Sequence, residues 1–126
     1  MTLWVVKVGT SLLRGETAAT IDGYARCFAG AMARCDQVVL VTSGAVGLGC
    51  QKLALSSRPD TVVALQAAAA IGQGALMALY ERAMERHGYS VAQVLLTRSD
   101  LADRRRYQNA SGTLRQLLSW GVLPVI

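Results

Sequence analysis

The sequence predicts an α/β fold of three layers, in which a mainly parallel sheet is covered by helices on both faces. Four short apolar runs recur along the 126 residues, with few polar positions inside them. Runs of this kind are typical of parallel strands, which are buried on both faces. Stretches with apolar residues at helical spacing separate the runs, and strands that alternate with helices of about ten or more residues form parallel crossover units.

The predicted elements alternate along the chain. We expect strands at residues 3–8, 37–41, 91–96 and 122–126. Helices are expected at residues 22–34, 60–86 and 104–120, with another beginning near residue 45. Pro59 lies just before the long helix, as helix N-termini favour, and Gly121 is suited to end the last one. We expect the fourth strand to end as an unpaired or frayed edge.

The composition is that of one globular domain. Apolar residues make up 52% of the chain and charged residues 17%, which is enough apolar surface for a buried core. The formal net charge of +5 comes mainly from scattered arginines. Their one run, at residues 104–106, lies beside Asp100 and Asp103 and is interpreted as a solvated helix start. We therefore expect no contact with nucleic acid.

Cysteine and histidine usage indicates a reduced compartment. The three cysteines have no Cys-x-x-Cys spacing and there is a single histidine, so neither a disulfide framework nor a zinc site is indicated. The N-terminus has no basic region and no small-residue cleavage site, so no signal peptide is expected. We expect a cytoplasmic protein.

An uncharged stretch at residues 62–79 is about as long as a membrane-spanning helix. It is rich in alanine, and it contains two glutamines and two glycines, which insert poorly into lipid. We expect this helix to be buried between other elements of the fold, without membrane contact.

The turn after the first strand is suited to an anion. Gly9 allows a ligand to approach the backbone closely, and Thr10 and Ser11 supply hydroxyl donors. Lys7, near the strand end, supplies an ammonium group where a transferring phosphoryl group gains charge. The alternative interpretation is that Lys7 simply reaches water from the end of its strand.

The turn after the second strand contains Ser43, Gly44 and Ala45. A helix beginning near Ala45 would direct its N-terminal N–H groups at a carboxylate or a phosphate. The alternative interpretation is that the glycine after this strand serves a tight turn alone. Two such turns at the ends of neighbouring strands favour an anion site. The spacings of a P-loop, a dinucleotide-binding turn and a serine-hydrolase elbow are absent from the sequence.

Five segments together resemble the glutamate 5-kinases, a branch of the amino-acid-kinase family. They are residues 5–13, 39–46, 66–73, 95–100 and 107–110, and the resemblance extends over nearly the whole chain. It is most specific at Gly9-Thr10-Ser11. The related acetylglutamate kinases carry a Lys-x-Gly-Gly pattern there, and uridylate kinases a Ser-Gly-Glu pattern. The resemblance implies an amino-acid-kinase-like fold.

The resemblance also implies an activity, namely ATP-dependent phosphorylation of the γ-carboxylate of L-glutamate to γ-glutamyl phosphate, the first step of proline biosynthesis. Lys7 would be the catalytic lysine that contacts the ATP phosphates, and Gly9, Thr10 and Ser11 would line the phosphate side of the site. Mg²⁺ would accompany ATP, and no residue of this chain is assigned to the metal.

The second turn would hold the amino acid, through Ser43, Gly44 and Ala45. By the same resemblance, residues 1–126 would be the N-terminal, amino-acid-binding part of the kinase domain, without the nucleotide-binding C-terminal lobe. We expect the chain to be inactive alone and the full-length protein to be a homo-oligomer. Two alternatives remain: another kinase of the family, acting on acetylglutamate, aspartate or uridylate, and a non-catalytic interaction domain.

Overall fold

The structure, a computed structural model, describes residues 1–9 and 17–126. In order along these two segments, the elements are β1 (Leu3–Val8), α1 (Thr17–Ala33), β2 (Gln37–Thr42), α2 (Ala45–Lys52), α3 (Val62–Glu85), β3 (Val91–Gln93), α4 (Arg98–Ala102), α5 (Arg104–Ser119) and β4 (Leu123–Val125). Every strand and helix that the sequence predicts is present, and α4 is additional.

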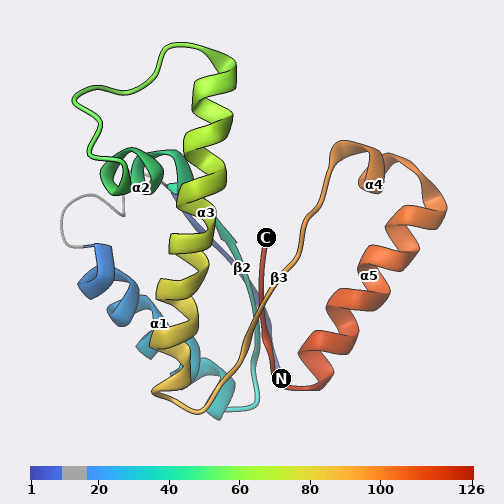
Figure 1. The fold of residues 1–126 in the computed structure, drawn as a ribbon. Coiled ribbons are helices and arrows are strands. Elements are labelled where there is room, and N and C mark those ends of the chain that lie inside the picture. Colours follow the sequence, from blue (N-terminus) through green and yellow to red (C-terminus); the bar gives the residue numbers. More distant parts are fainter. Residues whose placement is uncertain (10–16) are drawn as a thin grey trace.

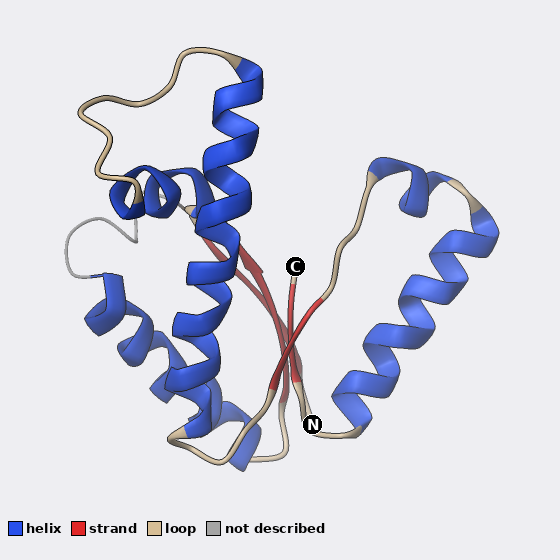
Figure 2. Cartoon of the chain, viewed as in Figure 1, coloured by secondary structure: helices blue, strands red, loops and turns tan. Residues whose placement is uncertain are grey.

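The described strands form one parallel sheet in the order β1-β2-β4-β3. β1 and β2 pair along their whole length, from Leu3 opposite Gln37 to Val8 opposite Thr42. Helices α1 and α3 cover one face of the sheet, and α5 lies against the other (Figures 1 and 2). The predicted three-layer α/β fold is therefore confirmed.

The main core lies between the sheet and the layer formed by α1 and α3. Leu40 of β2 and Leu123 of β4 are fully buried in it, and Ile21 of α1 and Tyr80 of α3 close it from the helical side. Full burial of a large apolar side chain contributes about 1.5–3 kcal/mol. These contacts hold α1 and α3 in place above the strands that carry the two predicted turns.

The fourth strand lies inside the sheet, so the expectation of an unpaired edge is wrong. β4 pairs with β2 where Leu40 lies opposite Val125, and it pairs with β3 from Val91 opposite Leu123 onward. The connection through α5 returns the chain to the space between β2 and β3. A long crossover allows a later strand to insert between two earlier ones, and the sequence pattern does not record this order.

Two boundaries differ from the sequence prediction by three residues or more, and α4 was not predicted. α1 begins at Thr17, earlier than expected, and β3 ends at Gln93 rather than at residue 96. α4 starts with a reciprocal cap: the N–H of Asp100 donates to the Thr97 hydroxyl at 3.3 Å, and the N–H of Thr97 donates to the Asp100 carboxylate at 2.8 Å. A threonine followed three residues later by an acidic residue is the sequence pattern of such a helix start.

α3 is covered along one side only, so the expectation of a helix buried between other elements is wrong for the described residues. Val62 and Val63 are 69% and 77% exposed. By length and composition alone, α3 could cross a membrane. In the apolar 18-residue stretch of α3 that meets this test, 17% is buried inside the structure. One such helix is weak evidence for a membrane span, because core helices of soluble proteins pass the same test. The buried residues of α3 are Ala68, Gly72, Leu76, Tyr80, Ala83 and Met84.

Asp36 ties the first residues of the chain to the start of β2. Its carboxylate accepts a hydrogen bond from the backbone N–H of Thr2 at 2.9 Å and another from the indole N–H of Trp4 at 3.1 Å. Both donors favour the charged form, and they lower the pKa of Asp36 below its usual value of 3.8. This clasp holds the N-terminal end of β1, which is an edge strand of the described sheet.

We expect acid to open the Asp36 clasp. Because the folded-state pKa is lowered, the stabilisation from Asp36 is complete above the unfolded-state value near 3.8 and is lost as the pH falls through the lower folded-state value. Trp4 fluorescence, followed from about pH 6 to about pH 2 in a Trp120→Phe background, should report this opening. Asp36→Asn keeps the shape without the titrating carboxyl, so a pH step that persists in this variant would assign the transition to another group.

Candidate functional site

The ends of β1 and β2 meet at the edge of the sheet where both strands finish. The backbone N–H of Ser43 donates to the carbonyl of Val8 at 3.1 Å, and the Ser43 hydroxyl donates to the same oxygen at 3.3 Å. These bonds continue the contact one residue beyond the last strand pair, Val8 and Thr42. The two predicted turns therefore leave neighbouring strands, as the sequence indicates.

Lys7 lies one residue before the end of β1, opposite Val41. Its side chain is exposed, whereas the next side chain, Val8, is 2% exposed and belongs to the core. Successive side chains of a strand point to opposite faces, so Lys7 lies on the face of the sheet away from α1 and α3. The lysine therefore avoids the desolvation cost of burial, and its ammonium group is accessible to a ligand.

The first turn is described only at its start. Among the described residues, a Cβ added at Gly9 would meet nothing within 4 Å, so packing does not require glycine at this position. Thr10 and Ser11, which were predicted on the phosphate side, lie outside the described residues. In the described part of the chain, the phosphate side of the candidate site thus consists of Lys7 and Gly9.

Gly44 makes the turn between β2 and α2. Its φ of 108° and ψ of 2° lie in a region that residues with side chains rarely adopt. The carbonyl of Gly44 accepts the first hydrogen bond of α2, from the N–H of Leu48 at 3.1 Å. The N–H groups before Leu48 have no acceptor within the helix and carry the partial positive charge of its N-terminus. Ser43, Gly44 and Ala45 thus form one turn suited to an anion.

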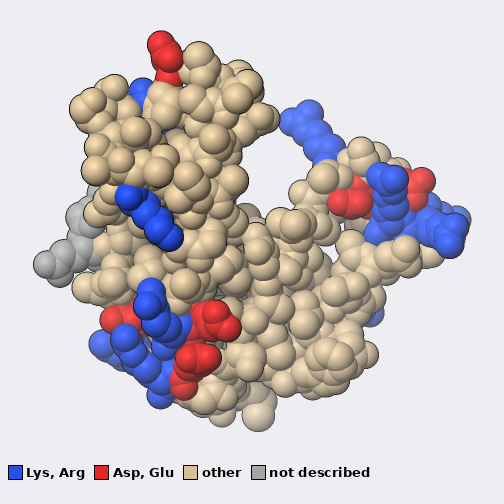
Figure 3. Space-filling view, in the orientation of Figure 1, with Lys and Arg blue, Asp and Glu red and all other residues tan. Residues whose placement is uncertain are grey.

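Charged side chains near this edge of the sheet are mixed in sign. Figure 3 shows the molecule hollowed between the α3 side and α4, with basic and acidic side chains intermingled around α4 and the start of α5. Within residues 1–9 and 17–126, no group of three or more His, Cys, Asp or Glu is placed to hold a metal ion. The described residues contribute the ammonium group of Lys7, backbone donors and the hydroxyl of Ser43 to the candidate site.

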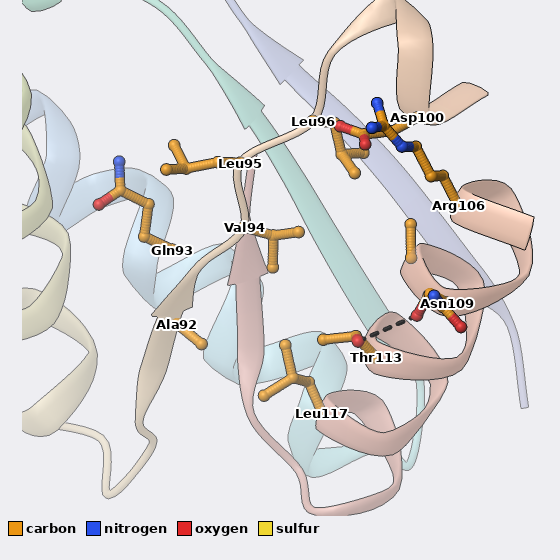
Figure 4. A pocket seen from close by; sticks show the side chains of 11 residues that line it. Ala92, Gln93, Val94, Leu95, Leu96, Asp100, Arg106, Asn109, Thr113 and Leu117 are labelled. Atoms are coloured by element: carbon orange, nitrogen blue, oxygen red, sulfur yellow. Dashed lines mark hydrogen bonds between the residues drawn. The ribbon is translucent and has the colours of Figure 1, made fainter. Parts of the chain in front are cut away.

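A hollow of about 510 Å³ lies between the β3–α4 connection and α5 (Figure 4). Asp100 and Arg106 lie close together at one end of it, and Asn109 and Thr113 follow along α5. The N–H and the hydroxyl of Thr97 lower the pKa of Asp100, and the guanidinium of Arg106 adds a smaller effect. Asp100 and Asn109 belong to two of the five segments on which the resemblance rests, and Arg106 and Thr113 lie outside them. None of the four was predicted as a site residue.

Residues 2–126 match the amino acid kinase family. The chain belongs to this family. Its relatives include the glutamate 5-kinases of Synechococcus sp. (strain CC9605), at 93% identity over 126 residues, and of Parasynechococcus marenigrum (strain WH8102), at 77% over 126 residues. The glutamate 5-kinase of Prochlorococcus marinus (strain MIT 9313) is 68% identical over 130 residues.

Each of these alignments covers 100% of the chain, and 35%, 35% and 36% of the respective relative. The chain therefore spans about a third of the length of the curated relatives it matches. The family membership that the five segments indicated is confirmed, as is the resemblance to the glutamate 5-kinases within the amino acid kinase family.

Replacing Gly44 with alanine is expected to destabilise the 126-residue chain by about 1–2 kcal/mol, because a Cβ is disfavoured at this backbone conformation. Gly23→Ala in α1 is the matched control. An added Cβ there meets nothing within 4 Å, so the higher helix propensity of alanine should stabilise the chain by about 0.5–1 kcal/mol. Urea unfolding midpoints measure both effects, and shifts of the same sign would contradict the conformational requirement at Gly44.

Proposed function

We propose that the protein phosphorylates the γ-carboxylate of L-glutamate with ATP to give γ-glutamyl phosphate, the first step of proline biosynthesis. The observation that carries this proposal is the 93% identity, along all 126 residues, to a relative named glutamate 5-kinase. More distant relatives that align with the whole chain carry the same name. L-Glutamate and ATP would be the small-molecule partners, and copies of the complete enzyme would associate in the cytoplasm.

Phosphoryl transfer depends on positioning and charge stabilisation more than on covalent help from the protein. A carboxylate oxygen of glutamate attacks the γ-phosphorus of ATP, the bond between that phosphorus and the bridging oxygen breaks, and ADP leaves. The exposed ammonium of Lys7, near the end of β1, would lie beside the transferring group and stabilise its negative charge. Mg²⁺ would enter with ATP, and we assign no residue of this chain to it.

The turn from Ser43 to Ala45 would hold glutamate. The first N–H groups of α2 favour an anion, and the two bonds from Ser43 to the Val8 carbonyl keep the turn beside the end of β1. With one substrate at each of two neighbouring strand ends, the attacking carboxylate and the phosphoryl group are brought together. Orientation of this kind can contribute about 7–11 kcal/mol to lowering a barrier.

The proposal can be tested in a hybrid enzyme, namely the full-length Synechococcus CC9605 relative with its matching segment replaced by these 126 residues. We expect the hybrid to release ADP only when L-glutamate is present. Aspartate, N-acetylglutamate and uridylate serve as alternative acceptors, and the unaltered relative is the positive control. Turnover with one of these acceptors in place of glutamate would overturn the proposed substrate. A hybrid that is folded but inactive with every acceptor would overturn the proposed activity.

In the hybrid, Lys7→Ala should reduce kcat by about 10²-fold or more and change the KM for glutamate little, because the ammonium group acts mainly on charge that develops in the transition state. Steady-state kinetics at saturating ATP measure this effect. Lys52→Ala, which removes an exposed lysine from the last turn of α2, is the matched control and should keep normal turnover. Near-normal turnover in Lys7→Ala would remove the lysine from the catalytic role.

Ser43→Ala should show the opposite balance, with a raised KM for glutamate and a smaller effect on kcat. On binding, the Ser43 hydroxyl would turn from the Val8 carbonyl, which it meets at 3.3 Å, to donate to the glutamate carboxylate. Loss of a hydrogen bond to a charged group costs about 1–3 kcal/mol, which corresponds to an increase in KM of about 5-fold to 150-fold. Ser57→Ala, in the exposed loop before α3, should leave both constants unchanged. If the KM for ATP rises while that for glutamate stays constant, the two turns are assigned to the wrong substrates.

A further inference from the structure

Helix α3 contacts the proposed glutamate turn on both sides, through residues that the proposed mechanism does not use. We propose that Gly72 and Tyr80 are positioning residues, which set the place of the turn from Ser43 to Ala45 and thereby the affinity for glutamate. This inference rests on the proposed function. It names the two residues of α3 that fix the geometry of the glutamate turn.

Gly72 brings the backbone of α3 against the first residue of α2. A Cβ built at Gly72 would overlap the carbonyl oxygen of Ala45 and would lie 2.6 Å from the backbone N of Gly49. The obstacle is backbone in both cases, so no side-chain rotation could relieve it. Any side chain at position 72 would push α2 away from α3. The displacement would occur at the N-terminal end of α2, where Ala45 belongs to the proposed glutamate turn.

The close approach is repeated one turn further along α2. A Cβ at Gly49 would overlap the carbonyl oxygen of Ala68, and Ala68 is itself 2% exposed. These contacts lie at two positions along the axis of α2, so together they fix the distance between the two helices and the tilt of α2. Glycine weakens a helix interior relative to alanine, and the close approach accounts for its presence at both facing positions.

Tyr80 supports the turn from the other side. Its side chain is fully buried, and its hydroxyl lies 3.4 Å from the hydroxyl oxygen of Thr42. The Thr42 hydroxyl in turn donates to the carbonyl of Ser43 at 3.4 Å. With Thr42 donating in that direction, its oxygen is left to accept from Tyr80. Burial raises the pKa of Tyr80, so this hydroxyl keeps its proton at neutral pH.

The proposed site is therefore bracketed by α3. Tyr80 acts through the residue just before Ser43, and Gly72 acts on the residue just after Gly44. Both residues are buried: Tyr80 lies in the core against the sheet, and Gly72 lies against α2. Such support matters for a ligand because misplacement by about 1 Å can cost about 10²-fold in rate.

Tyr80→Phe in the hybrid enzyme tests the first contact, because it removes one hydroxyl and keeps the buried ring. We expect the KM for glutamate to rise about threefold to tenfold, as for a lost hydrogen bond, with the KM for ATP unchanged. Tyr89→Phe is the matched control: Tyr89 is partly buried against the core just before β3, at the opposite edge of the sheet, and its loss should change neither constant.

Gly72→Ala tests the second contact, with Gly74→Ala as its control. Gly74 lies on the same helix, is exposed, and has nothing within 4 Å of an added Cβ, so both variants gain the same helix propensity. We expect Gly72→Ala to raise the KM for glutamate about tenfold or more while the KM for ATP stays within about twofold, and Gly74→Ala to behave like the unsubstituted hybrid.

The outcomes separate this inference from the proposed function. An unsubstituted hybrid without glutamate-dependent turnover overturns the proposed function itself. An active hybrid in which both Tyr80→Phe and Gly72→Ala keep a normal KM for glutamate overturns only the positioning role. If Gly72→Ala fails to fold, Tyr80→Phe decides alone. Equal increases in the KM values for glutamate and ATP would show a general loss of structure instead of positioning, and would also overturn the inference.

Discussion

The site depends first on the parallel register of β1 and β2. Side chains alternate between the two faces of a strand, so a slip of one residue would turn Lys7 into the core and Val8 toward solvent. It would also move the Val8 carbonyl away from Ser43. The register is held at both ends, by the Asp36 clasp where the strands begin and by the Ser43 bonds where they finish.

The helices add a second constraint on the same place. α2 is short, and among its described residues only Gly49 is fully buried, while Leu48 packs partly buried against the core. Backbone contact with α3 sets the position of α2, and α3 is in turn anchored on the sheet by Leu76 and Met84. The proposed glutamate turn is thus located by the core, although none of its own residues is part of that core.

Much of this architecture could be predicted from local patterns. The apolar runs gave all four strands, and the small residues after two of them located the turns that leave neighbouring strands. The order of the strands was missed because it depends on pairing between distant segments, such as Leu40 with Val125. The exposed outer side of α3 was not predicted for a related reason. The apolar composition of a helix does not show which of its faces other elements of the fold will cover.

Individual site residues show the same limit. Gly9 and Gly44 look alike in sequence, yet among the described residues only Gly44 combines a turn at the candidate site with a backbone conformation that requires glycine. The contact between Thr42 and Tyr80 joins residues 38 positions apart, which no motif connects. The hollow beside Asp100 and Asn109 likewise forms only when α5 folds back along β3.

The central place of β4 has a consequence for how the chain folds. β1, α1 and β2 are adjacent both in sequence and in space, so they can associate as soon as they have been synthesised. β3 ends at Gln93 and has no described neighbour except β4, which begins only at Leu123. Until β4 arrives, the edge of β2 stays open and β3 has nothing to pair with. The three residues of β4 therefore complete the sheet by pairing β3 with the β1–β2 pair that formed before them.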